Sequence, residues 1–330
     1  MIKKKKTNIV NISVKLILAL LFLVVIYRQI FIKNDAELMW LELKSTLQIS
    51  NSYLLINAVL LMFVNWSFEA LKWKVLVSSF EKISFLKSLE TVLLGLATGI
   101  VTPAKLGDFF GRVLLLENKN NWKGVWATFI SGIAQNLVTI ILGFAGLIYV
   151  FTNFYKIDDY LFYSFVYIGI FLILILIYLY YNIDFALYLA KKTGLKKIVG
   201  KIIESDSGIG GFITTDILNK VLLLSFLRYL VFAFQFFLII RFFGITGSLF
   251  SLLAAIATIF IIQSSIPLPP VTNILARGEI AILILGYFTD NKIMILSSAF
   301  SIWFINILIP SLVGLILIIR VNIPKSFGYD

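Results

Sequence analysis

The stretch ATGIVTPAKLGDFFGR, residues 97–112, places three charged side chains in an apolar neighbourhood. Lys105, Asp108 and Arg112 are three and four residues apart, so on a helix they share one face. Pro103 ends the preceding helix, and the backbone N–H groups freed at the next one favour an anion. A charge at the bilayer centre costs from about 3 to more than 10 kcal/mol. This pattern predicts a polar site for an anionic headgroup, with Lys105 and Arg112 as cations and Asp108 orienting Arg112.

Small residues in the same stretch support a second interpretation. Gly107 and Gly111 have a G-x-x-x-G spacing, and Gly95 and Gly99 repeat it on the preceding arm. Glycine faces let helix backbones approach closely in lipid. The alternative is therefore a tightly packed hairpin in which Asp108 and Arg112 only pair with each other, four residues apart.

A second break rich in proline lies in the C-terminal half. Arg277 would add a cation to the site, and Glu279 would pair with a cation from the first half. Since they are two residues apart, they face different sides of a helix and should not pair with each other. The alternative is that both side chains extend to the outer interface. The residues of the break are Pro267, Pro269 and Pro270, followed by the polar Asn273.

Polar residues at helical spacing also interrupt other apolar segments. Glu69 lies one turn deeper than Lys72, which can equally mark the end of its segment, and Arg228 lies about halfway through another. Trp66 and Trp73 are typical of the membrane interface. Such polar stripes serve helix packing as well as ligand binding. The stripes are Asn65, Glu69 and Lys72; Ser131, Gln135 and Thr139; Arg228 and Gln235; and Asn306 before Pro310.

The composition is that of a membrane protein. Of 330 residues, 60% are hydrophobic and 14% charged, and the mean hydropathy is +0.98, whereas a soluble domain is about half apolar and a quarter charged. Without Cys or His, the chain lacks thiolate nucleophiles, His bases and the usual zinc or haem ligands, so we expect no metal and no cofactor. The net charge of +12 suits loops that face anionic lipid, and we expect no nucleic-acid binding.

Apolar segments of about 20 residues predict six full transmembrane helices. Two further apolar regions, 86–117 and 248–289, each consist of two shorter arms around a break that contains proline. The predicted helices are residues 9–32, 52–76, 124–151, 160–182, 217–243 and 292–320.

The distribution of Lys and Arg orients these segments. The connections 72–88 and 183–216 are rich in Lys and should be cytoplasmic, whereas the loop 152–159 holds two Asp and should be outside. Each broken region then begins and ends on one side, which predicts two re-entrant helical hairpins. Both termini are predicted to be cytoplasmic in the cell (inner or plasma) membrane.

The predicted fold is therefore an all-α polytopic membrane protein with an inverted-topology repeat. Residues 1–159 form the first repeat, with two spans, one hairpin and one span, and residues 160–330 form the second in the opposite orientation. Many secondary transporters are built in this way, with broken segments in corresponding places. If the breaks were simple kinks, each region would instead form ordinary spans.

The chain resembles the lysylphosphatidylglycerol synthase transmembrane-region family, also called the UPF0104 group, over nearly its whole length. GIVTPAKLGDFFGR is similar to the first motif of that family, and NWSFEALKW precedes it. The residues that match are Pro103, Lys105, Gly107, Asp108 and Arg112, with Asp in place of the usual Glu.

A second motif carries the resemblance more loosely. Pro267, Arg277 and Glu279 match it, whereas Pro270 and Val271 stand where many members have a glycine pair. The resemblance implies movement of lipids with modified or charged headgroups between leaflets. Some members carry an aminoacyl-transferase domain, which we do not expect on this chain, because only VNIPKSFGYD follows residue 320.

We therefore expect a lipid flippase whose partners are membrane phospholipids with anionic or aminoacylated headgroups, and an oligomer is compatible with the sequence. Two other classes remain open. One is an integral-membrane transferase acting on a lipid phosphate, for which a carboxylate such as Asp108 would be the base. The other is a non-catalytic lipid-binding scaffold. A transporter rather than an enzyme is the favoured class.

Overall fold

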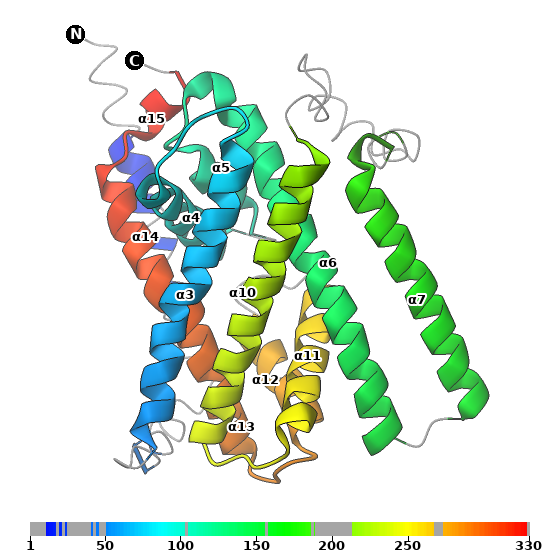
Figure 1. Ribbon diagram of the computed structural model, residues 1–330. Helices are drawn as coiled ribbons and strands as arrows, with labels where there is room; N and C mark the ends of the chain where they lie inside the picture. The colour runs from blue at the N-terminus through cyan, green and yellow to red at the C-terminus, as the bar shows by residue number, and fades with distance from the viewer. Residues whose placement is uncertain are drawn as a thin grey trace.

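The computed structural model describes residues 11–17, 20–21, 24, 41, 44–45, 51–102, 105–155, 158–185, 188, 213–266 and 273–328. The regular structure in these ranges is helical (Figure 1). The long and medium helices are α3 (Ser52–Val77), α4 (Phe85–Ile100), α5 (Leu106–Val113), α6 (Asn121–Phe154), α7 (Asp159–Tyr181), α10 (Thr215–Phe242), α11 (Leu249–Ser265), α12 (Asn273–Leu285), α13 (Lys292–Trp303) and α14 (Ile309–Arg320). Shorter elements are the 3-10 helix η3 (Asn118–Asn120), the π-helix η5 (Phe304–Leu308) and α15 (Ile323–Ser326).

Five described helical segments are long and apolar enough to cross a membrane. They are Ser52–Val77, Asn118–Phe154, Asp159–Tyr181, Thr215–Phe242 and Lys292–Arg320. These segments confirm five of the six predicted spans. The sixth, 9–32, falls mostly outside the described residues, although residues 11–17 are helical.

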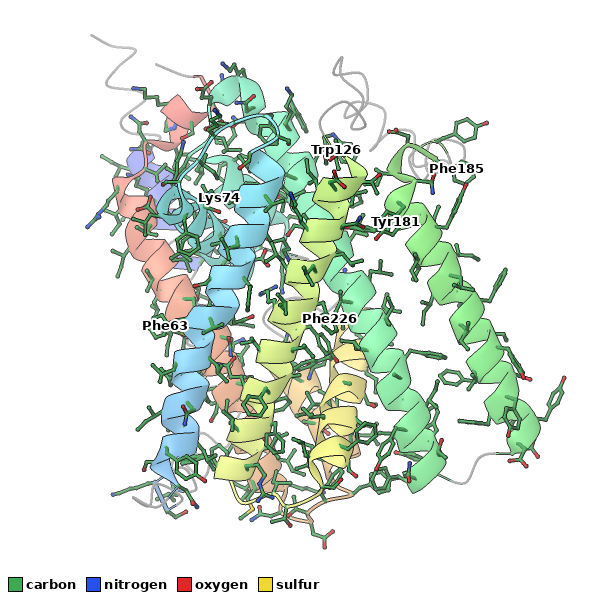
Figure 2. All side chains as sticks on the ribbon, in the orientation of Figure 1. Phe63, Lys74, Trp126, Tyr181, Phe185 and Phe226 are labelled. Carbon is green, nitrogen blue, oxygen red and sulfur yellow. The ribbon has the colours of Figure 1, made fainter. Side chains whose placement is uncertain are left out.

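The outer surface of this bundle is apolar. Phe63 of α3 is 61% exposed and Phe226 of α10 is 38% exposed, and Figure 2 shows both side chains along the middle of their helices. Lys74 lies nearer the end of α3 (Figure 2). Apolar side chains around the middle of long helices are what a lipid environment requires. The structure is therefore that of an integral membrane protein.

Contacts between turns show which turns share an end of the molecule. The side-chain amide of Asn121 donates a hydrogen bond of 2.9 Å to the backbone oxygen of Ser326, so the turn before α6 meets the C-terminal segment. At the opposite end, Tyr149 and Ser251 hydroxyls lie 2.8 Å apart. The two groups of turns agree with the sides predicted from charge. Which end faces the cytoplasm remains a prediction.

Helices α4 and α5 pack against each other as a helical hairpin, here called the first hairpin. The Thr98 hydroxyl donates a 2.6 Å hydrogen bond to the backbone oxygen of Gly107, and the Gly107 N–H donates a 2.7 Å bond to the Thr102 hydroxyl. A side chain at Gly107 would collide with the Thr98 carbonyl group. Glycine is therefore required by the close approach of the two backbones.

The turn of this hairpin changes the predicted place of Lys105. Its φ of 57° is left-handed, and α5 begins only at Leu106. Lys105 thus precedes the helix and does not extend the face of Asp108 and Arg112, because a residue in the left-handed conformation is not part of a regular right-handed helix. Pro103 lies outside the described residues.

The first hairpin reaches the middle of the bundle. Ile100, at the end of α4, packs with Trp303 and Leu308, which lie near the centre of the long segment Lys292–Arg320. A π-helix occupies that centre. Pro310 has no N–H to donate to the Asn306 carbonyl, which explains why the regular hydrogen-bond ladder is interrupted here.

Helices α11 and α12 form the second hairpin, whose arms pack against each other. Figure 1 shows α11 and α12 in the half of the molecule opposite to α4 and α5. The turn residues Pro267, Pro269 and Pro270 lie outside the described residues. The two broken regions thus extend from opposite ends, whereas their re-entrant placement in a bilayer stays a prediction.

Candidate functional site

A buried carboxylate lies at the centre of the candidate site. The Glu69 side chain on α3 is 3% exposed, and its oxygens contact three cations. Oε2 lies 2.8 Å from Lys72 Nζ and 3.0 Å from Arg228 Nη1, and Oε1 lies 2.9 Å from Arg112 Nη1. These cations come from α3, α5 and α10, so one carboxylate connects three helices. Glu69, its three cations Lys72, Arg112 and Arg228, and Asp108 are here called the charge cluster.

Helix geometry and glycine packing position the cluster. Glu69 and Lys72 are three residues apart on α3, and Asp108 and Arg112 are four apart on α5, so each pair shares a face. Arg112 Nε lies 2.8 Å from Asp108 Oδ1. A Cβ at Gly95 of α4 would meet Arg112 Cγ at 2.7 Å and would also meet the Asp108 carboxylate. The missing side chain of Gly95 therefore makes room for this ion pair.

Side chains of α6 complete the polar surroundings. Gln135 Oε1 accepts hydrogen bonds from Lys72 Nζ at 3.3 Å and from Arg228 Nη1 at 3.2 Å. The Ser131 hydroxyl donates a 3.5 Å bond to Glu69 Oε1. Thr139 donates instead to the Gln135 backbone oxygen, at 2.9 Å. Of the three polar residues predicted on this helix face, Ser131 and Gln135 thus contact the charge cluster, whereas Thr139 bonds within α6.

Two tryptophans cover the arginines of the cluster. The Arg228 guanidinium carbon lies 5.5 Å from the centre of the Trp66 ring, and that of Arg112 lies 5.4 Å from Trp73. Both distances suit cation–π attraction. The sequence suggested that both tryptophans lie at the membrane interface, whereas Trp73 is fully buried. The spacing of Trp66, Glu69 and Trp73, by three and four residues on one helical face, was the signal that could have found them.

The two hairpins bring further cations to the cluster. Lys105, before α5, lies within Coulombic range of Asp108, Arg112, Arg228 and, across the molecule, Arg277 of α12. Lys105 is exposed and Arg277 half-buried, while the Asp108 side chain is 26% exposed. Lys105 and Asp108 thus retain solvent-accessible surface near Arg112 of the charge cluster. Four of these cations, Lys72, Lys105, Arg112 and Arg228, lie near the two carboxylates Glu69 and Asp108, which leaves two positive charges in excess among these six residues.

Other predicted site residues lie elsewhere. Asn65 donates a 3.0 Å hydrogen bond to the Asn306 side chain and links α3 to the π-helix. Gln235 donates to the Ala58 backbone oxygen at 2.6 Å, a further link between α10 and α3. Glu279 is exposed, and the carboxylate that the cations contact is Glu69. The Asn273 side chain lies outside what the structure describes.

The glycines predicted to shape the hairpin do so. A Cβ at Gly111 would come within 2.5 Å of the Leu94 backbone oxygen, and one at Gly99 would come within 3.3 Å of Asp108 Cβ. The packed-hairpin interpretation and the polar-site interpretation are therefore compatible, because the same glycines that allow close packing also place Asp108 and Arg112.

Glu81, which lies in a turn outside the membrane-spanning segments, has a lowered pKa. Partial burial of Glu81 opposes its ionisation, but hydrogen bonds from the Asn120 amide and the Glu117 backbone N–H, together with Lys87, hold its pKa below the ordinary value of 4.5. The Asn120 amide nitrogen lies 2.9 Å from Glu81 Oε2. Glu81 therefore connects the turn after α3 to the turn before α6, at the end of the molecule where α4 begins.

One comparison with known proteins gives a match. A family described as "Lysylphosphatidylglycerol synthase TM region" matches residues 12–314, which include every residue of the charge cluster and Arg277. No curated protein sequence matches the chain significantly.

Proposed function

This chain belongs to the lysylphosphatidylglycerol synthase transmembrane-region family, and we propose that it acts as a flippase, which moves phospholipids or lipid-linked anionic headgroups between membrane leaflets. The headgroup passes through the polar region between the two hairpins, while the acyl chains stay in lipid. Membrane phospholipids are its partners, and transport rather than catalysis is its activity.

The excess of positive charge at the charge cluster and the neighbouring Lys105 carries this proposal. Arg228 lies at the middle of α10 and Gln135 near the middle of α6, so the cluster is far from both ends of the spanning helices. Positive charge at such depth is costly unless an anion compensates it. Glu69 and Asp108 neutralise two of the four cations Lys72, Lys105, Arg112 and Arg228, and a phosphate would neutralise more.

Accessibility supports a transient ligand rather than a fixed internal partner. Lys105 is exposed, and the Arg228 side chain is 21% exposed although it lies 3.0 Å from the buried Glu69. A phosphate that contacts Lys105 and Arg277 would touch one residue from each hairpin. If the hairpins are re-entrant from opposite sides, as an inverted repeat predicts, small movements of either one would open the site to one leaflet at a time.

Leaflet exchange in vesicles tests the proposal. The purified protein is reconstituted into liposomes with a trace of headgroup-labelled phosphatidylglycerol, and dithionite is added to bleach the label in the outer leaflet. We expect the inner-leaflet label to be bleached in protein-containing vesicles only. Lys105→Gln should slow this exchange, whereas Lys119→Gln, which removes a charge that is 78% exposed, should not.

Two outcomes would contradict the proposal. Absence of exchange for phosphatidylglycerol and for a total lipid extract of labelled lipids would favour the scaffold interpretation. Equal exchange by the Lys105→Gln protein would show that transport does not use the exposed cation beside the charge cluster.

A further inference from the structure

The last spanning segment, Lys292–Arg320, packs against both hairpins. Its first half, α13, lies against α12 of the second hairpin, where a Cβ at Gly278 would come within 2.7 Å of the Leu296 side chain. Its second half, α14, lies against α4 of the first hairpin, and Figure 1 shows these two pairs in opposite halves of the molecule. A Cβ at Gly314 of α14 would collide with the Leu93 backbone oxygen. Each half of the segment is thus closely packed on a different hairpin.

The π-helix lies between these two halves. Because Pro310 cannot donate to the Asn306 carbonyl, the hydrogen bonding that stiffens a helix is interrupted there. Side chains satisfy backbone oxygens around the break. The Asn306 amide donates to the Ile302 oxygen at 3.4 Å, and the Ser311 hydroxyl donates to the Leu308 oxygen at 2.8 Å. Such local partners make a break tolerable at membrane depth, and spanning helices bend at breaks of this kind.

The break also contacts α3 and the tip of the first hairpin. The Asn65 amide donates a 3.0 Å hydrogen bond to the Asn306 side chain, and both residues are buried. Asn65 lies one helical turn before Glu69 on α3, so the break lies close to the charge cluster. Ile100, at the hairpin tip, packs with Trp303 directly before the π-helix. A bend at this place would therefore move the hairpin tip relative to Glu69.

We propose that the π-helix is the joint about which the two hairpins move relative to each other. α14 and the first hairpin form one body, α13 and the second hairpin form the other, and the segment bends between them. Hinges of a few residues connect rigid bodies in this way in many conformational changes. An unbroken helix packed on both hairpins would instead hold them at one distance. The inference rests on the proposed function, because it names the part of the fold that lets the hairpins open the site in turn.

Distances between spin labels test the joint. The natural chain has no Cys, so two introduced Cys residues carry the only labels. Leu86→Cys on α4 with Leu283→Cys on α12 reports on the two bodies, since both side chains are exposed. Pulsed electron paramagnetic resonance is recorded on the full chain in phosphatidylglycerol nanodiscs. We expect two maxima in the distance distribution of this pair.

Two further pairs show where the bend lies. Leu86→Cys with Leu312→Cys lies within the first body, and Leu283→Cys with Lys292→Cys lies within the second. Each of these pairs should give a single maximum. Two maxima between the bodies and one within each body place the bend between α13 and α14, without any change to the joint itself.

A proline variant tests the break directly. Pro310→Ala supplies the missing N–H donor and favours a continuous helix, so the pair between the bodies should lose one of its two maxima. Pro324→Ala, in α15 after the spanning segment, should keep both maxima. Thermal unfolding of each variant identifies a folding defect, and the three pairs in the otherwise natural chain decide the question if Pro310→Ala does not fold.

The inference is overturned if the pair between the bodies gives one maximum, if a pair within a body gives two, or if folded Pro310→Ala keeps both maxima. Leaflet exchange is measured separately on the natural chain. Two distances without exchange of any lipid contradict the flippase proposal and leave the joint standing. Exchange with a single distance overturns the joint and leaves the flippase proposal standing.

Discussion

Glu69 Oε2 of α3 and Arg228 Nη1 of α10 lie 3.0 Å apart, and this ion pair joins two spanning helices that are far apart in the chain. The same carboxylate contacts Arg112 of the first hairpin at 2.9 Å. Glu69 therefore fixes the hairpin relative to α3 and α10. Most of the expected behaviour of variants follows from this arrangement.

Replacing Glu69 with Gln should destabilise the protein strongly. The change leaves three buried or partly buried cations without their shared carboxylate, and removing one partner of a buried pair typically costs about 3–5 kcal/mol. Thermal unfolding in detergent measures the effect. Glu117→Gln is the matched control, because that carboxylate is 59% exposed and its ion pair contributes at most about 1 kcal/mol. Equal stability of the two variants would contradict a central role for Glu69.

Replacing Arg112 with Lys should impair leaflet exchange although the charge is kept. Arg112 uses Nε to contact Asp108 and Nη1 to contact Glu69, and a single ammonium cannot reproduce this fork. If one such contact is lost, each 1.4 kcal/mol of lost interaction energy should slow exchange roughly tenfold. Vesicle exchange rates measure it, with Arg241→Lys at the end of α10 as the control. An unchanged rate for Arg112→Lys would show that charge alone is sufficient.

A methyl group at Gly107 should disrupt the first hairpin. It would lie 2.5 Å from the Thr98 carbonyl carbon, and overpacking of this kind costs about 1–3 kcal/mol. Gly132→Ala on α6 is the matched control, since a Cβ there meets nothing within 4 Å. That change should be neutral or slightly stabilising because Ala favours the helix. The two unfolding temperatures give the comparison, and equal temperatures would argue against close packing at Gly107.

Stability should depend on the ionisation of Glu81 at acid pH. The pKa of Glu81 is lowered in the folded state, so its contribution is fully present above the ordinary value of 4.5 and disappears as pH falls through the lower, folded-state value. The stability difference between wild type and Glu81→Gln should thus be constant near neutral pH and shrink below pH 4.5. Denaturant unfolding over this range checks the trend. A difference that grows on acidification would reverse the assigned sign.

The sequence predicted the spanning segments well because long apolar runs depend on local composition alone. The runs 52–76 and 217–243 correspond to α3 and α10 to within a few residues. The first hairpin was also predictable, since Pro103 and the glycine spacings mark a break and a small face. The position of Lys105 before the helix was not predictable, because the packing of the two arms determines which turn residue adopts the left-handed backbone conformation.

For the site, the sequence identified most participants but not their partners. Asp108 and Arg112 are neighbours on one helix, so their pairing could be predicted from spacing. Glu69 contacts Arg228 only because α3 and α10 pack side by side (Figure 1), and nothing in either segment specifies that pairing. Glu279 was the expected carboxylate partner, and the exposed position of its side chain follows from how α12 is rotated in the bundle.

By itself, then, the sequence determined that this is a helical membrane protein with charged residues inside its apolar segments, because hydropathy and helical spacing are local properties. Only the tertiary structure decided that Glu69 is the shared counter-charge, that Trp66 and Trp73 cover the arginines, and that α14 packs against the first hairpin. Each of these depends on the packing of helices from distant parts of the chain, where distance and burial, rather than residue type, set the strength of an interaction.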